Sequence, residues 1–334
     1  MCKNRVENAE EKRFKMRLRC RCNRGSLFFE VNFPPLPCSV SGRTLPFKPR
    51  SISLIQDQIG STGTFVDHAE SREASPPSGG ESARLRVIDV RKSLGGTQIL
   101  NGITLDAEVK RVTGVIGPNG AGKSTLLNVI AGLLKPDKGQ ILLGTSDMTL
   151  LPVRKRAGLG MVRTFQLSRE LGELTVLENL LVAPLNQIGE RAINAFFQRK
   201  KVRTQERFLA EHARQHLQRV GLWKLADAPA RTLSGGQKRL LELSRALMLD
   251  PKIILLDEPA AGVSPPMRLE ISNVIRDLRA EGKTLVVVEH DMDFVAKLCD
   301  YVYVLAEGTN LTGGSFNDVV SDERVIRAYL GGVA

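Results

Sequence analysis

Three short motifs follow one another in this sequence, and each contains residue types that can act on phosphates. The first is GPNGAGKS at 117–124, and the others are LSGGQ at 233–237 and IILLDEP at 253–259. The first matches the pattern G-x-x-x-x-G-K-[ST], in which glycines let backbone N–H groups curl around phosphate oxygens and a helix N-terminus adds partial positive charge. We therefore predict that this loop holds the phosphates of a nucleotide.

The neighbours of this loop agree with that prediction. An apolar strand is expected at 112–117 and a helix with apolar spacing at 124–134. Lys123 is placed to reach the β- and γ-phosphates, and the Ser124 hydroxyl is placed to ligate Mg²⁺. A glycine-rich turn that binds nothing is the alternative, and the intact Lys-Ser pair argues against it. The predicted nucleotide-binding residues are Gly117, Pro118, Asn119, Gly120, Ala121, Gly122, Lys123, Ser124 and Thr125.

The third motif delivers two carboxylates to the end of a buried strand. The apolar run 253–256 ends in Asp257 and Glu258, and ligands of open α/β sheets bind at the carboxyl ends of the strands. We predict that Asp257 holds Mg²⁺ through water and that Glu258 orients or deprotonates the attacking water. A solvated strand end would look the same in isolation, but a phosphate-binding loop upstream favours the catalytic interpretation.

The LSGGQ motif alone is compatible with a plain helix N-cap ahead of 238–248, because a Ser-Gly-Gly turn fits both roles. Together, however, the three motifs resemble those of ATP-binding cassette (ABC) subunits, over about residues 83–334. In that family, LSGGQ of one subunit contacts the γ-phosphate held by the P-loop of another. The resemblance therefore implies nucleotide contacts in trans from Ser234, Gly235, Gly236 and Gln237.

Two further positions match the family. Gln166 in VRTFQ corresponds to the loop glutamine that touches Mg²⁺ and the attacking water while linking to the membrane partner, and His290 in VVVVEHD corresponds to the switch histidine that contacts the γ-phosphate. A lone histidine at a strand end is more often structural. Its place one strand after Glu258 favours the catalytic role. The resemblance thus implies Glu258, His290, Gln166 and Lys123 as catalytic residues, and Ser124, Gln166 and Asp257 as metal ligands.

Two positions depart from the family pattern. Leu94 in KSLGG stands where an aromatic residue usually stacks on adenine, so we expect weaker nucleotide affinity or selectivity. Ser264 in AAGVSP stands where the family usually has Asp or Asn, in a loop that crosses the dimer. We expect this change to affect coupling between the two ATP sites more than hydrolysis itself.

Longer stretches indicate a branch of the family. The segments 163–184, 257–265, 287–305 and 325–331 look like those of ATPase subunits of branched-chain amino-acid importers. The ATPase subunits of urea importers and lipopolysaccharide exporters have similar sequences in these segments and remain alternatives. The importer resemblance implies a second cassette (a copy of this chain or a paralogue), transmembrane permeases and, indirectly, an external substrate-binding protein.

Two functions of other classes stay open. ABC ATPases of translation or DNA repair work without a membrane partner, but they usually carry two cassettes or a long coiled-coil insertion, and this sequence shows neither. A regulatory cassette that does not hydrolyse ATP is the other alternative. The intact Lys123, Asp257 and Glu258 argue against it, while Leu94 and Ser264 leave it open.

The expected fold is α/β: a P-loop NTPase cassette with a parallel core sheet, a small antiparallel sheet near 85–109 and an inserted helical subdomain at about 169–232. The first 82 residues combine a basic stretch, a Pro-rich stretch and a Ser/Pro/Gly/Glu mixture, which is typical of disorder. No apolar run follows the basic start, so no secretory signal is expected. This extension is either a tether to anionic lipid or without function.

The composition of the chain indicates which partners and which cellular compartment to expect. A net charge of +12 is compatible with binding to nucleic acid, with proximity to an anionic membrane surface, or simply with a basic soluble protein. We favour the membrane surface, and with aromatic residues at 5% no stacking platform for nucleic acid is expected. The longest apolar runs, such as 285–288, fall far short of the roughly 20 residues that span a bilayer. Five cysteines form no C-x-x-C pair, which suggests a reducing compartment. We predict a peripheral protein on the cytoplasmic face of the inner or plasma membrane.

Overall fold

The computed structural model describes residues 17–23, 26–32, 83–164, 171–190 and 197–330. The chain forms two compact units, Met1–Glu73 and Ala74–Ala334. In the first unit, β1 (Arg17–Asn23) and β2 (Ser26–Asn32) form an antiparallel pair with Asn23 opposite Ser26. The rest of the extension predicted to be disordered lies outside the described residues, and so does Gln166.

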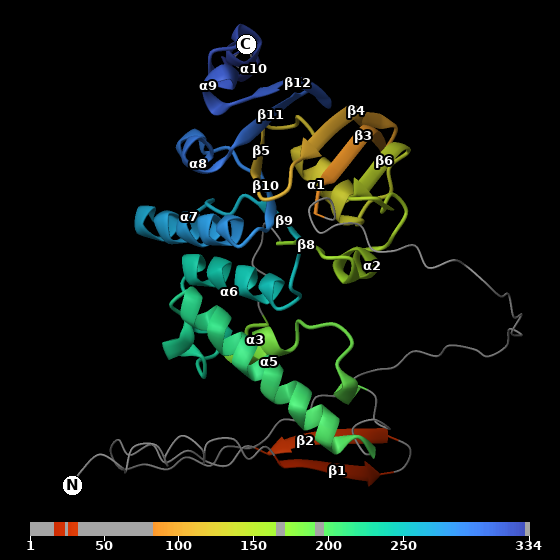
Figure 1. Cartoon of the computed structure of the whole chain (residues 1–334), viewed down its shortest axis with the longest axis vertical. Coiled ribbons are helices and arrows are strands. Elements are labelled where there is room, and N and C mark those ends of the chain that lie inside the picture. Colours follow the sequence, from red (N-terminus) through yellow and green to blue (C-terminus); the bar gives the residue numbers. More distant parts are fainter. Residues whose placement is uncertain (1–16, 24–25, 33–82, 165–170, 191–196, 331–334) are drawn as a thin grey trace, which may run out of the picture. The chain divides into compact units, whose positions relative to one another are not determined.

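The second unit is built on a six-stranded sheet that confirms the predicted parallel core (Figure 1). Its strand order is β12-β11-β5-β10-β9-β8, and β12 alone runs antiparallel to its neighbour. Every residue of β5, β9 and β10 is buried, as expected of near-continuous apolar runs covered on both faces. The strands are β5 (Val112–Ile116), β8 (Met161–Arg163), β9 (Ile253–Asp257), β10 (Thr284–Val288), β11 (Tyr301–Ala306) and β12 (Thr309–Gly314).

A four-stranded antiparallel sheet forms where the sequence predicts one. Its order is β4-β3-β6-β7, from β3 (Leu85–Leu94), β4 (Thr97–Ala107), β6 (Lys138–Leu143) and β7 (Ser146–Asp147). The strand patterns at 85–109 predict β3 and β4, whereas β6 and β7 lie outside the predicted range. The pairing of β6 with β3 is long-range and places Ile141 opposite Val87 in the core, which local pattern alone does not reveal.

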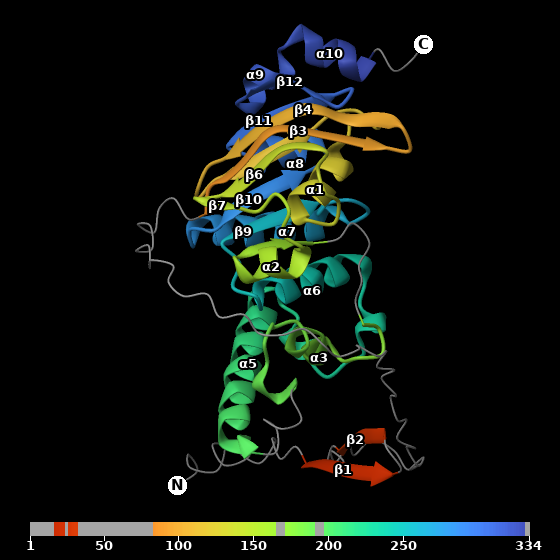
Figure 2. The same cartoon turned by 90° about the vertical axis from the view of Figure 1, so that its right-hand side faces the viewer.

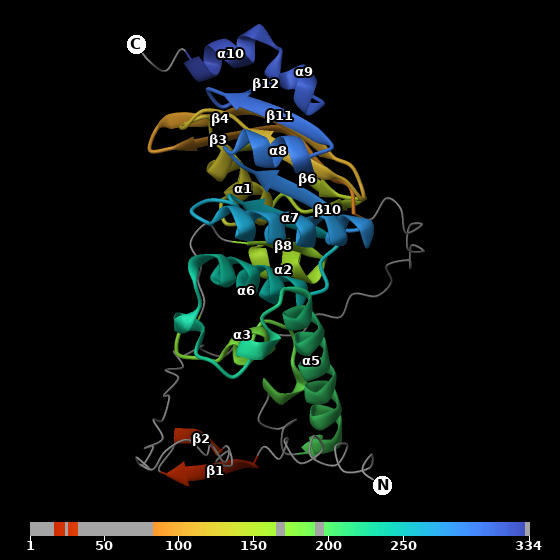
Figure 3. The same cartoon turned by 90° about the vertical axis from the view of Figure 1, so that its left-hand side faces the viewer.

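Successive residues of the central strands point to opposite faces of the sheet and so enter two different cores. Ile253 and Leu255 pack with α1 (Lys123–Ala131) and the antiparallel sheet, whereas Ile254 and Leu256 pack with α6 (Gly235–Leu247) and α7 (Pro265–Ala280). Figure 2 shows α1 and the antiparallel sheet on one side, and Figure 3 shows α7 and α8 (Met292–Leu298) on the other. The P-loop helix and the LSGGQ helix therefore lie on opposite faces of the sheet.

Most of the remaining helices belong to the segment between β8 and β9. The longest is α5 (Arg199–Arg219), which buries Leu209, Ala213 and Leu217 at four-residue spacing. The others in this segment are α3 (Val176–Leu181) and the 3₁₀ turns Ile188–Glu190, Trp223–Leu225 and Ala230–Thr232. The short α2 (Val153–Gly158) precedes β8, while α9 (Phe316–Val320) and α10 (Glu323–Leu330) follow β12. The bounds of the helical insert stay a prediction, since residue 169 is not described.

Over the part of the chain that the structure describes, no helix has both the length and the apolar character needed to cross a bilayer.

Candidate nucleotide-binding site

The loop 117–122 joins β5 to α1 and leaves the start of that helix open. Gly122 is the N-cap residue, with φ of 94° and no side chain to accept the first N–H groups. A Cβ at Gly122 would lie 2.8 Å from Leu100 Cδ2 and 3.0 Å from the Ile99 carbonyl oxygen, both on β4. Both the backbone conformation and the close approach of β4 therefore require glycine. An uncapped helix start of this kind suits a phosphate.

Lys123 folds back over this loop. Its side-chain Nζ donates to the carbonyl oxygens of Gly117 (2.7 Å) and Pro118 (2.9 Å), and the residue is only 9% exposed. Burial lowers the pKa of Lys123, while the nearby carboxylates of Glu258 and Asp257 raise it. None of the described carboxylates forms a direct ion pair with this ammonium. A phosphate bound in the loop would supply the missing negative charge.

Asp257 is held in place by a residue that the sequence analysis missed. Arg163 of β8 donates to Asp257 Oδ2 at 2.7 Å and to Asn128 Oδ1 of α1 at 2.6 Å. Both members of the ion pair are buried, with side-chain exposures of 9% for Arg163 and 2% for Asp257. The only sequence feature that could have indicated Arg163 is its place at the end of a short apolar strand. Removal of one partner from such a pair leaves an uncompensated buried charge.

The donor set fits the predicted Mg²⁺. Asp257 Oδ1 is buried and has no hydrogen-bond partner among the described residues, so one carboxylate oxygen remains for a metal-bound water. Ser124 follows Lys123 at the start of α1 and is exposed. Hydroxyl and carboxylate oxygens are ligands that Mg²⁺ prefers. The third predicted ligand, Gln166, lies outside the described residues.

Glu258 and His290 follow neighbouring parallel strands, and the structure brings them together. His290 Nδ1 lies 3.9 Å from Glu258 Oε1, and the His290 side chain is 60% exposed. Glu258 adopts a left-handed backbone conformation with φ of 47°, and its N–H donates to the Val288 carbonyl oxygen at 2.9 Å. Glu258 and Asp257 are also the carboxylates that influence Lys123. Asp257, Glu258 and His290 thus lie at the carboxyl ends of β9 and β10, and Lys123 of the P-loop lies near the two carboxylates.

The LSGGQ segment is capped within its own chain. Ser234 is the N-cap of α6; its Oγ accepts from the Gln237 N–H (3.3 Å), and Gln237 Oε1 accepts from the Ser234 N–H (2.9 Å). This is a capping box. A Cβ at Gly236 would collide with the Met267 side chain of α7, so glycine is required there by packing. Ser234 and Gly235 are exposed.

The two positions that depart from the family pattern are both at surfaces. Leu94 ends β3 and is 41% exposed. Ser264 is the N-cap residue of α7, but its side chain accepts no capping hydrogen bond.

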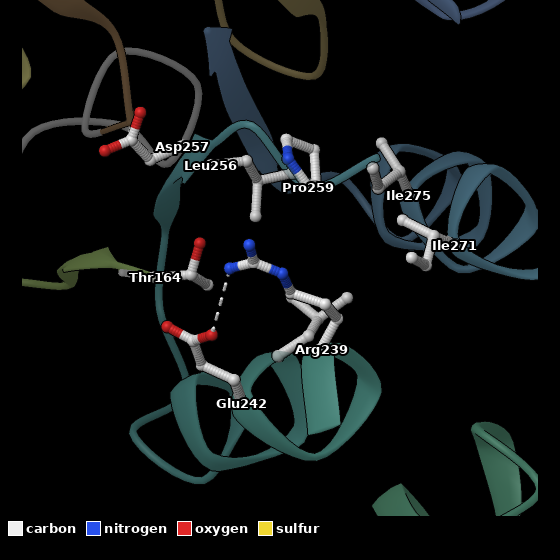
Figure 4. A pocket seen from close by; sticks show the side chains of 9 residues that line it. Thr164, Arg239, Glu242, Leu256, Asp257, Pro259, Ile271 and Ile275 are labelled. Atoms are coloured by element: carbon white, nitrogen blue, oxygen red, sulfur yellow. Dashed lines mark ion pairs between the residues drawn. The ribbon is translucent and has the colours of Figure 1, made fainter. Parts of the chain in front are cut away.

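A small cavity lies beneath Asp257 on the α6–α7 face of the sheet. Arg239 and Glu242 of α6 form an ion pair in it, with Arg239 Nη1 3.8 Å from Glu242 Oε2, and Figure 4 shows the Asp257 carboxylate pointing away from that pair. The cavity contains no residue of the P-loop. Its lining is completed by Thr164, Leu243, Leu256, Pro259, Ile271 and Ile275.

Comparison with known proteins places this arrangement among ATP-binding cassettes. The family pattern described as ABC transporter matches residues 100–261. A probable branched-chain amino acid transport ATP-binding protein of Methanocaldococcus jannaschii is 39% identical over 74% of this chain and 97% of its own length. The high-affinity branched-chain amino acid transport ATP-binding proteins of Pseudomonas aeruginosa and Escherichia coli are 38% and 37% identical, each over 74% of this chain and 97% of their own lengths.

Solved structures lead to the same result. A crystal structure of a nucleotide-free ATP-binding cassette from an ABC transporter superposes with a TM-score of 0.64 at 38% identity, over 73% of this chain and 98% of that one. The ADP conformation of an ATP-binding cassette superposes with a TM-score of 0.64 at 38% identity, over 74% of this chain and 98% of that one. Both similarities cover nearly the whole cassette, so they extend well beyond the three motifs.

Proposed function

The chain belongs to the family of ATP-binding subunits of ABC transporters, and on this premise we propose that two cassettes bind two ATP molecules between them to drive import of branched-chain amino acids. ATP binding and hydrolysis follow from the family. The amino-acid substrate is proposed because the similar proteins of three organisms carry that activity in their names.

One observation supports a shared site. The P-loop helix α1 packs in the core on one face of the sheet, and the LSGGQ helix α6 packs in the core on the other face. The open N-terminus of α1 and the exposed Ser234–Gly235 turn therefore belong to separate surfaces of one chain. A second cassette in head-to-tail orientation brings its own LSGGQ turn to the phosphates held here.

The residues of the site have distinct roles in this proposal. Lys123 exchanges the carbonyl oxygens of Gly117 and Pro118 for the β- and γ-phosphates. Glu258 orients the attacking water, and His290 contacts the γ-phosphate. Ser234 and its neighbours donate to the γ-phosphate of the opposite subunit. The loop that contains Gln166 passes the change in the site to the permease.

The proposed metal ligands are Ser124, Asp257 and Gln166. Mg²⁺, when bound, neutralises charge that develops on the phosphoryl oxygens. Arg163 donates to Asp257 Oδ2, so Oδ1, which is buried and has no hydrogen-bond partner among the described residues, would be the oxygen that accepts from a metal-bound water.

Family membership implies transmembrane permeases as partners, and we propose that the subunit sits on them at the cytoplasmic face of the membrane. An external binding protein would deliver the amino acid to these permeases. The net charge of +12 supports a location next to anionic lipid. The first half of α5 contributes exposed basic side chains on one helix, at Lys200, Lys201, Arg203 and Arg207.

The shared site is tested by Glu258→Gln, which keeps the shape of the side chain but removes its ability to activate water. We expect this variant to bind ATP, to hydrolyse it at least about 100-fold more slowly, and to elute as a dimer with MgATP. The matched control is Glu258→Gln with Lys123→Ala, which should stay monomeric. A monomer at saturating ATP for Glu258→Gln alone would contradict pairing of identical chains, and addition of a paralogous cassette then tests a mixed pair.

The substrate is tested by reconstitution with the permeases and binding protein in lipid vesicles. Uptake of leucine that requires ATP supports the proposal. Uptake of urea with a urea permease, or extraction of lipopolysaccharide with an exporter permease, would show that the transported substrate is not a branched-chain amino acid. ATP hydrolysis that ignores all permeases would indicate an ABC ATPase without a membrane partner, and no hydrolysis under any condition would indicate a regulatory cassette.

A further inference from the structure

Glu289 is a fully buried carboxylate between β10 and His290, with 0% exposure. In the described part of the chain no lysine or arginine forms an ion pair with it, but His290 Nδ1 lies 3.8 Å from its Oε2. It also accepts backbone hydrogen bonds: the Ala260 N–H reaches Oε1 at 2.8 Å, and the His290 and Asp291 N–H groups reach Oε2 at 3.0 and 3.5 Å. A buried carboxylate is costly unless it is hydrogen-bonded, so these contacts must be maintained.

The two oxygens of Glu289 hold two different segments. Oε1 binds the segment that follows Glu258, and Oε2 binds the segment that contains His290. The proposed catalytic residues Glu258 and His290 lie at the ends of separate strands, and the Glu289 side chain bonds to the backbone two residues after Glu258 and to the backbone of His290 itself. The side chain therefore acts as a bridge between the two halves of the site.

The conformation of Glu258 shows why such a bridge is needed. Its φ of 47° is a left-handed conformation that is unfavourable for a residue with a Cβ. Such a residue persists only where its surroundings hold it. The Glu258 N–H donates to the Val288 carbonyl oxygen, and the Glu258 carbonyl oxygen accepts from the Ala261 N–H. Between these two residues, the Ala260 N–H donates to Glu289.

His290 is also held from its other side. Asp291 caps α8, because its Oδ1 accepts from the Phe294 N–H at 3.1 Å, and its Oδ2 pairs with Arg268 of α7 at 2.5 Å. The His290 backbone is thus held between Glu289 and an anchored Asp291. Its imidazole nevertheless remains 60% exposed. A rigid backbone beneath an exposed side chain is the arrangement expected of a preorganised catalytic group.

We propose that Glu289 is a positioning residue for ATP hydrolysis, which sets the Glu258 carboxylate and the His290 imidazole at their 3.9 Å separation. The proposal rests on the catalytic roles proposed above for Glu258 and His290. Glu289 itself contacts neither the nucleotide loop nor, being buried, the solvent where ATP binds. Its contribution is therefore to the chemical step and not to binding.

The test is Glu289→Gln, which preserves size but offers one acceptor oxygen in place of two. The amide NH₂ must face an N–H donor of either Ala260 or His290, so one of the two links is lost. We expect kcat to fall about 10- to 100-fold, since small displacements of catalytic groups have effects of that size. The KM for ATP should change less than about twofold, because Lys123 and the P-loop are untouched.

The matched control is Asp300→Asn. Asp300 Oδ2 accepts the Val112 N–H at 2.9 Å, and its Oδ1 pairs with Arg279 at 2.7 Å, at the amino ends of the strands and away from the site. This change should lower the melting temperature but leave the kcat of the folded protein unchanged. A Glu289→Gln enzyme with wild-type kcat, with a loss in KM alone, or with no more loss than the control would overturn the proposal.

Coupling to the site gives a second readout. The kcat losses of Glu289→Gln and His290→Ala should combine less than multiplicatively, since both disturb one unit. A fully multiplicative combination counts against the bridge. If the proposed catalytic role of Glu258 is wrong, the result differs: Glu258→Gln then retains ATP hydrolysis, whatever the effect of Glu289→Gln.

If Glu289→Gln does not fold, the proposal can still be tested on the wild-type protein. Hydrogen exchange of the Ala260 and His290 amides in the nucleotide-free chain should be as slow as that of the β10 amides. The Ala260 and His290 amides donate to the buried Glu289 carboxylate, and the β10 amides pair within the buried sheet. Exchange as fast as that of an exposed loop would show that the bridge does not hold, and would overturn the proposal.

Discussion

Two glycine-containing turns lead into helices on opposite faces of one sheet, and they treat their first N–H groups in different ways. The turn before α1 ends in Gly122, which has no side chain to cap the helix. The turn before α6 begins with Ser234, whose side chain forms a capping box with Gln237. The first turn is thus open to an anion, whereas the second is already closed within its own chain.

The glycines differ as well. Gly122 is required by a left-handed backbone and by the approach of β4, and it lies beside the buried Lys123. Gly236 is not left-handed, and the side chain that excludes a Cβ there is Met267 of α7. The P-loop therefore leaves its helix start open to an anion, whereas the LSGGQ turn is fixed by contacts within its own chain.

The largest expected effect comes from Lys123→Ala. We expect ATP turnover to fall at least about 100-fold, because the ammonium that binds the β- and γ-phosphates is lost. The melting temperature should not fall, since burial of this ammonium is unfavourable and lowers its pKa. The measurements are steady-state hydrolysis and thermal unfolding. Lys283→Ala serves as control: it removes an ammonium paired with Asp250 at 2.7 Å, away from the site, and should spare turnover.

A stability effect of intermediate size is expected for Gly236→Ala. The new Cβ collides with Met267, which should destabilise the protein by about 2 kcal/mol and lower the melting temperature by several degrees. Gly235→Ala is the matched control, because no atom lies within 4 Å of its Cβ position. Equal melting temperatures for the two variants would contradict the packing argument. Met267→Ala in the Gly236→Ala background should restore part of the loss.

The smallest effect on stability is expected for Ser234→Ala, which removes the cap of α6 at a cost of about 1 kcal/mol. Ser315→Ala removes the equivalent serine from the capping box of α9 and should cost about as much. Turnover separates the two: it should fall only for Ser234→Ala, whose hydroxyl is proposed to reach the opposite nucleotide. Equal turnover in both variants would show that Ser234 acts only as a cap, and would count against the shared site.

The sequence predicted the elements that carry local signals. The strand, glycine loop and helix around Lys123 were predicted because apolar runs and glycines stand at fixed spacing, and the structure has β5 and α1 there. The strand ending in Asp257 was predicted for the same reason. The predicted roles of these residues stay predictions. Gln166 lies outside the described residues, so its role also stays a prediction.

Contacts between distant segments escaped the sequence analysis. Arg163 and Asp257 are 94 positions apart, Ala260 and Glu289 are 29 positions apart, and neither pair follows a periodic pattern. Roles were assigned only to charged residues that match a known motif position, and Glu289, although it lies in VVVVEHD, matches none. Its neighbour His290 was recognised only through resemblance. Buried polar partners depend on which strands become neighbours, and local sequence does not specify that order.

Local sequence specifies the chemical groups of this protein: a loop for phosphates, two adjacent carboxylates, a histidine and a serine-glycine turn. Each can be recognised because its residues stand close together in one short segment. How these groups are distributed over the two faces of the sheet depends on the tertiary fold. Because successive side chains of β9 point to opposite faces of the sheet, α1 packs on one face and α6 packs on the other. The order of the strands places β10 beside β9, so that the buried Glu289 can join the segments of Glu258 and His290.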